Sequence, residues 1–174
     1  MKLPWIKKVI KIPIMSRSEK RYFEGLKDAQ GSKDIKKKIT AYENNLKSLE
    51  DFISEWLARD GELPPIIPCR DELPELYKQI GDWKNAERVI KHCIACNAYF
   101  PENGETELKD LLLYQIAAEK ALELIKENPG VLQKNIYKML KDENLDDYSL
   151  KHFTRCSLQI KKVPANGTNR LYAK

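Results

Sequence analysis

Apolar side chains in the N-terminal half recur every three or four residues, the spacing that places them on one face of an α-helix. This pattern predicts a helix over residues 34–58, with the apolar face formed by Ile35, Ile39, Tyr42, Leu46, Leu49, Ile53 and Trp56. An earlier helix is expected to run from Ser18, a capping residue, to about Ala29, before Gly31–Ser32. The proline-rich stretch GELPPIIP, residues 61–68, ends this part of the chain and acts as a spacer.

Two further helices are expected on either side of Gly81–Asp82, which form a tight turn. The first helix ends at Ile80 and presents Leu76, Tyr77 and Ile80, while the second presents Trp83, Ala86, Ile90 and Cys93. These two faces predict an αα-hairpin, in which the small side chain of Ala86 allows the helices to approach closely.

The motif L-Y-x-x-x-G-D-W-x-x-A within this hairpin resembles a tetratricopeptide repeat over about residues 70–97. Gly81, Asp82, Trp83 and Ala86 occupy the turn and small-residue positions of that family. Residues 18–58 have a similar rhythm, but with a lysine near the small-residue position and a longer loop, so we do not expect a regular array. The resemblance implies a helical module that binds a partner protein or self-associates.

The C-terminal third is expected to begin with the loop PENGET and a long helix over residues 107–127 that is apolar on two sides. Asn128 and Pro129 are a helix-start signal, which predicts a second helix through VLQKNIYKML. A third helix is expected over residues 147–157. The strand LQIKKV, a turn with positive φ at Asn166–Gly167 and the strand RLYA then form a β-hairpin.

The segment PGVLQKNIYKML…SLKHFTRCSLQIKKV…NRLY resembles a winged helix over about residues 106–174. In that family the third helix enters the major groove of DNA and the β-hairpin, or wing, contacts phosphate or the minor groove. The resemblance therefore implies a DNA-binding surface formed by Lys134, Asn135, Tyr148, Ser149, Lys151, His152, Arg155, Lys161, Lys162, Asn166, Thr168, Asn169 and Arg170. Cationic and amide side chains of this kind donate hydrogen bonds to phosphates and base edges.

The charge distribution agrees with an anionic partner. The chain of 174 residues has a net charge of +5, and residues 129–174 alone hold nine Lys or Arg against four acids, also a net +5. From Tyr148 to Lys174 there is no Asp or Glu, and Met1–Ser18 is a second stretch without acids. Such asymmetry favours an anionic partner at one end or both, although a solvated charged face is the ordinary alternative.

Several classes of function find little support in the sequence. No run of about 18 apolar residues predicts a membrane span, and MKLPWIKKVIKIPIM lacks a signal-peptide pattern, so we expect a cytoplasmic protein with reduced cysteines. Cys93 and Cys96 have CxxC spacing beside His92, but they fall inside a predicted helix, so we expect small buried side chains and no metal. With two histidines and no phosphate-binding loop, we expect no enzyme and no cofactor.

The sequence thus predicts a mainly α-helical chain in three parts. These are a basic, apolar arm (1–17), interrupted by prolines and therefore extended, a module of TPR-like helical hairpins (18–104) and a winged helix with a small β-hairpin (105–174). The predicted function is DNA binding, in a transcription-regulatory protein whose helical module binds a partner protein or dimerises. The alternative is a protein–protein interaction adaptor whose winged helix does not bind DNA.

Overall fold

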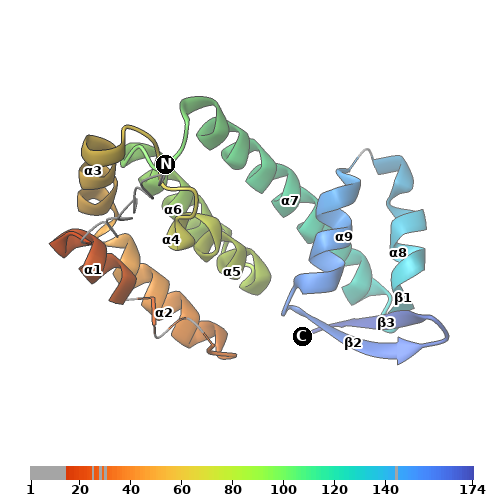
Figure 1. Cartoon of the computed structure of the whole chain (residues 1–174). Coiled ribbons are helices and arrows are strands. Elements are labelled where there is room, and N and C mark those ends of the chain that lie inside the picture. The colour runs from red at the N-terminus through yellow and green to blue at the C-terminus, as the bar shows by residue number, and fades with distance from the viewer. Residues whose placement is uncertain (1–14, 25, 28, 30, 144) are drawn as a thin grey trace, which may run out of the picture.

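The computed structural model describes residues 15–24, 26, 27, 29, 31–143 and 145–174. The described chain is mainly helical and ends in a small antiparallel sheet (Figure 1). Most of the predicted arm, residues 1–14, lies outside the described residues. The helices of the N-terminal part are α1 (Arg17–Glu24), α2 (Ile35–Leu46), α3 (Leu49–Asp60), α4 (Pro68–Asp71), α5 (Leu73–Ile80) and α6 (Trp83–Ala95).

The C-terminal part alternates helices and strands around the long helix α7 (Pro101–Glu127). In chain order it continues with β1 (Val131–Leu132), α8 (Gln133–Met139), a short 3₁₀ turn (Lys141–Glu143), α9 (Asp147–Cys156), β2 (Ile160–Ala165) and β3 (Thr168–Ala173). The three strands pair antiparallel in the order β1-β3-β2, so β3 is central.

Two hydrophobic cores lie along α7. The first gathers buried side chains of α1–α6 with Leu111 from the N-terminal half of α7. The second contains Tyr114 and the following inward positions of α7, together with α8, α9 and the sheet. Trp83 packs against both cores, and its ring meets Tyr114 edge-on at 5.8 Å between centroids. A single continuous helix therefore joins the two halves of the molecule (Figure 1).

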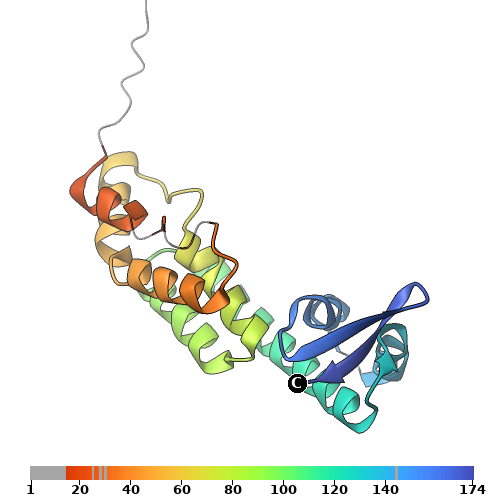
Figure 2. The ribbon, with the colours of Figure 1, turned by 90° about the horizontal axis from the view of Figure 1, so that it is seen from below.

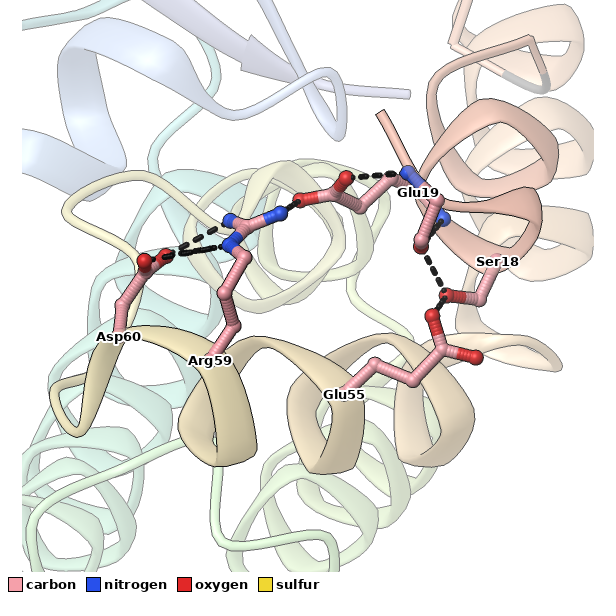
Figure 3. Close-up of polar contacts among 6 residues, drawn as sticks. Ser18, Glu19, Glu55, Arg59 and Asp60 are labelled. Carbon is pink, nitrogen blue, oxygen red and sulfur yellow. Dashed lines mark hydrogen bonds and ion pairs between the residues drawn. The ribbon is translucent and has the colours of Figure 1, made fainter. Parts of the chain in front are cut away.

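Helix α1 is fixed to α3 by a group of polar contacts (Figure 3). Glu19 is buried, and its carboxylate accepts from Arg59 Nη1 at 2.6 Å and from the backbone N–H of Ser16 at 2.7 Å. The hydroxyl of Ser18 donates to Glu55. Arg59 also pairs with the neighbouring carboxylate of Asp60. Because Glu19 is nearly inaccessible to water, these partners replace its hydration and make the docking of α1 specific.

The predicted single helix over residues 34–58 is wrong, because the chain breaks between α2 and α3. At the break, both the backbone N–H and the hydroxyl of Ser48 donate to the carbonyl of Asn45, at 3.1 Å each. Asn45 is buried and its amide nitrogen donates to the carbonyl of Tyr22 at 2.5 Å. Local bonds of Ser and Asn side chains compete with helical ones, and here they turn the chain. The first helix is also shorter than expected, ending at Glu24.

Two boundaries around α7 also differ from expectation. The predicted loop PENGET is the first part of α7, which begins with Pro101 at its first position. The predicted helix start at Asn128–Pro129 is instead the end of α7, where the N–H of Asn128 donates to Leu124. The chain then turns at Gly130 (φ +81°) and pairs with β3 before α8 begins.

Other predictions are confirmed. The αα-hairpin of α5 and α6 turns at Gly81 (φ +79°), and Ala86 is fully buried between the helices. The expected helix over residues 147–157 is observed as α9. The predicted β-hairpin turns at Asn166 (φ +34°) and Gly167 (φ +74°), the pair of positive φ values that a two-residue hairpin turn requires.

Candidate nucleic-acid interface

Helix α9 is anchored by its N-terminal cap and by its apolar face. The carboxylate of Asp146 accepts from the backbone N–H of Ser149 at 2.6 Å. Hydrogen bonds from the Ser149 hydroxyl and backbone lower the pKa of Asp146 below its ordinary value. On the inner face, Leu150 and Phe153 are buried in the second core. These contacts fix which side chains of α9 remain at the surface.

The exposed face of α9 carries three of the five residues that the sequence assigned to it. Tyr148 is 75% exposed, and Lys151 and Arg155 are exposed as well. Lys151 pairs with Asp147 one turn earlier, whereas no ion pair among the described residues involves Arg155. Arg155 is therefore the cation of this face most available to an anionic partner.

The other two α9 residues point elsewhere. Ser149 is only 5% exposed, so its side chain does not belong to the surface on which the sequence placed it. His152 turns toward the helical module: its Nδ1 lies 3.2 Å from the hydroxyl of Tyr114, and its Nε2 lies 4.0 Å from a carboxylate oxygen of Glu75. These contacts hold α9 against α5 and α7.

The pairing register divides the predicted wing residues between two faces of the β2–β3 hairpin. Lys162 pairs with the fully buried Leu171, so its side of the strand faces the core. The side chains of Lys161, Val163 and Ala165 alternate with that of Lys162 and lie on the outer face of the hairpin. Arg170 and Thr168, the partners of Val163 and Ala165, lie on the same outer face. Lys161 and Arg170 are exposed there, and one guanidinium nitrogen of Arg170 donates to the carbonyl of Gly130 at 3.2 Å.

The inner face of the hairpin is tied to the helices. The ammonium group of Lys162 donates to the backbone carbonyl of Arg155 near the C-terminal end of α9, where the helix dipole favours a cation. The amide of Asn169 donates to Gln133 Oε1 at 3.1 Å. Lys162 and Asn169 therefore hold the hairpin against the helices. Lys161 directly precedes the lysine that bonds the Arg155 carbonyl. Of the remaining predicted residues, Lys134 and Asn166 are exposed, and Asn135 and Thr168 are half-buried.

A hydrogen-bond network between α8, α9 and β3 was not predicted from the sequence. Thr154 is fully buried, and its hydroxyl lies 2.7 Å from that of Tyr137 and 3.2 Å from Gln133 Nε2. Gln133 also donates to Tyr137 at 2.7 Å and accepts from Asn169. The sequence feature that could have indicated this network is a threonine next to the apolar positions of an amphipathic helix, because a buried hydroxyl requires a hydrogen-bond partner.

The electrostatics of α9 differ between its two ends. Beside its N-terminal half lies a cleft of about 390 Å³ whose lining includes Glu75, Glu107, Asp110 and Asp146. Burial raises the pKa of Glu107 above its ordinary value. Lys78 reaches into the same cleft and pairs with Glu75 at 2.5 Å. The C-terminal end of α9, with Arg155 and the hairpin, is thus the end suited to a phosphate.

The cysteines and the long helices carry no further signal. Within the described ranges, no three His, Cys, Asp or Glu side chains converge as metal ligands, and Cys93 is fully buried in the first core. Burial raises the pKa of the nearby Cys69 thiol to about 12. None of the described helices combines the length and apolarity needed to cross a membrane. No protein-family model, curated protein or solved structure matches the chain.

Proposed function

We propose that residues 106–174 form a winged helix that binds duplex DNA, and that the chain is a transcription-regulatory protein. The element order α7, β1, α8, α9, β2, β3 supports the fold assignment. The observation that carries the function is that Arg155 and Lys161 are both exposed and without an ion-pair partner among the described residues. Lys162, which follows Lys161 in the chain, donates to the backbone carbonyl of Arg155 and so keeps the two segments close. The stretch from Tyr148 to Lys174 contains no Asp or Glu, so Arg155 and Lys161 have no acidic neighbour in this part of the sequence that competes with a phosphate.

In this proposal α9 and the hairpin have separate roles. Arg155, with Tyr148 and Lys151 on the same exposed face, approaches the base edges, while Lys161 and Arg170 on the outer face of the hairpin bind phosphates. The α5–α6 hairpin, which resembles a tetratricopeptide repeat, serves as part of a module for a partner protein or for self-association.

Binding of the full chain to a labelled random-sequence duplex tests the proposal. We expect binding that weakens with salt, and a loss of more than about tenfold in affinity at 50 mM salt for Arg155→Ala/Lys161→Ala, which removes one cation directed at the base edges and one that binds phosphate. The matched control is Lys109→Ala/Lys126→Ala, which removes two exposed lysines from α7. Equal affinities for the two variants would contradict the proposal.

The second candidate is a protein–protein adaptor, favoured by an apolar patch on the solvent side of α7. Leu112, Leu113 and Ile116 are 58%, 47% and 41% exposed, which is high for neighbouring large apolar side chains. An adaptor would bind a protein partner whose affinity is insensitive to Arg155→Ala/Lys161→Ala and falls when Leu112 and Ile116 are replaced by Ser. The DNA-binding proposal predicts instead that duplex affinity falls for Arg155→Ala/Lys161→Ala and is unchanged by the serine replacements.

A further inference from the structure

The N-terminal part of the chain is as basic as the C-terminal part, and the middle is acidic. Residues 1–47 hold thirteen Lys or Arg against five acids, whereas residues 48–128 hold nine against seventeen. If the chain bound an anionic polymer through its C-terminal end alone, the excess of cationic residues in the N-terminal part would have no role in binding. The position of the described N-terminal lysines in the fold is therefore informative.

Lysines gather around the N-terminal turn of α2. Lys33, Lys36 and Lys37 are exposed, and none of the ion pairs among the described residues involves them. Two of them line an open groove of about 610 Å³ together with Ser32, Thr40, Ala41 and Asn44, so no acid is among the described residues of the lining. Hydroxyl, amide and ammonium donors in one groove are the groups that bind phosphate oxygens.

Two acids of the described part of α2 and its cap, Asp34 and Glu43, have hydrogen-bond partners of their own. Asp34 caps α2, and its Oδ1 accepts from the backbone N–H groups of Lys36 at 2.9 Å and Lys37 at 3.4 Å. Glu43 accepts from the hydroxyl of Tyr77 at 2.7 Å and pairs with Arg88, on the side of α2 that packs on the α5–α6 hairpin. Neither carboxylate is among the described residues that line the groove, and Lys33, Lys36 and Lys37 together with Asp34 keep a net charge of +2.

The fold brings helix α2 to the same side of the molecule as the β2–β3 hairpin. Both α2 and the hairpin lie along the lower edge of Figure 1, and both are nearest the viewer in Figure 2, which shows the molecule from below. The outer face of the hairpin, with Lys161 and Arg170, points away from the core of the second half. Two separate basic surfaces are thus presented in one direction.

We propose that the α2 groove, lined by Lys36 and Lys37, forms with the neighbouring Lys33 a second phosphate-binding site that contacts the backbone of the same duplex as the hairpin. This inference rests on the proposed DNA binding and extends it, because the helical module then contributes directly to affinity. The α2 site contacts backbone only, so it raises affinity for every sequence equally, whereas α9 supplies the sequence preference.

The salt dependence of duplex binding tests the proposal. Each phosphate contact contributes about −0.9 to the slope of log K against log salt, so the variant Lys33→Ala/Lys36→Ala/Lys37→Ala should have a slope less negative by about 2.7. Between 50 and 200 mM salt, the unmodified chain should therefore lose about fortyfold more affinity than this variant. The control Lys84→Ala/Lys109→Ala/Lys126→Ala removes three exposed lysines elsewhere and should retain the original slope.

The outcomes separate the two proposals. If the α2 variant and the control have the same slope while Arg155→Ala/Lys161→Ala loses affinity, the second site is wrong and DNA binding by the winged helix stands. If the unmodified chain shows no salt-dependent duplex binding, both proposals fail. Circular dichroism of each variant checks that the overall helix content is kept, which is expected because alanine is a strong helix former.

Discussion

Replacing Thr154 by valine removes one hydroxyl from the network that joins α8 to α9 and preserves the β-branched shape. The Thr154 hydroxyl is fully buried and contacts Tyr137, Gln133 and the carbonyl of Lys151, at 2.7, 3.2 and 3.1 Å. Each hydrogen bond contributes about 0.5–1.5 kcal/mol net, and buried groups that lose their partner cost more. We therefore expect Thr154→Val to lower the free energy of unfolding by about 2 kcal/mol.

A double-mutant cycle with Tyr137→Phe separates the hydrogen bond from other effects. Tyr137→Phe should cost about 1 kcal/mol, because Gln133 and the Lys151 carbonyl still satisfy the Thr154 hydroxyl. Since both single variants lose the same bond, the double variant should cost about 1 kcal/mol less than the sum of the two. Urea unfolding at 25 °C, followed by tryptophan fluorescence and by circular dichroism, measures all four states.

Thr40→Val is the matched control, because Thr40 is exposed and its hydroxyl bonds only the carbonyl of Lys36 within α2. This variant should change the free energy of unfolding by less than about 0.5 kcal/mol. Two results would show that the buried network does not stabilise the fold as described. One is an equal cost for Thr154→Val and Thr40→Val, and the other is additive costs for Thr154→Val and Tyr137→Phe.

Three further predictions concern stability. Asp146→Ala should cost about 1 kcal/mol at pH 7. The contribution from the lowered pKa of Asp146 is fully present above the unfolded value of about 3.9, so this difference should shrink below that pH and disappear as the pH falls through the folded pKa, in urea titrations at several pH values. Gly81→Ala should cost about 1 kcal/mol or more, since φ is +79° and an added Cβ would lie 1.6 Å from Gln159 Nε2; Gln159→Ala should reduce that cost in thermal unfolding. Glu19→Ala should cost about 2 kcal/mol, and Arg59→Ala at least as much in thermal unfolding, because it leaves the buried Glu19 carboxylate without its cation.

Much of the fold could be predicted from the sequence where local signals were strong. The turns at Gly81 and at Asn166–Gly167 require positive φ values, and the sequence offers residues that tolerate them. Helix α9 has a clear apolar face bounded by an N-terminal aspartate. One boundary that failed depended on a distant contact: β1 exists because Val131 pairs with Leu171, forty residues away.

The candidate site was predictable in composition and only partly in geometry. Helical spacing alone placed His152 on the solvent face, but the neighbouring helical module supplies Tyr114 and Glu75, so that side is covered. Alternation along β2 separates Lys161 from Lys162, yet only the pairing with Leu171 shows which of the two faces the core. Such facts depend on elements remote in sequence, which periodicity cannot supply.

The most direct test of the central claim is a ¹⁵N–¹H NMR titration of the full chain with an unlabelled duplex at low salt. The account predicts that amide shifts concentrate at the C-terminal end of α9 and on the hairpin, around Arg155, Lys161 and Arg170, with few changes on the solvent side of α7. Shifts confined to the region of Leu112 and Ile116, or no shifts at all, would contradict it.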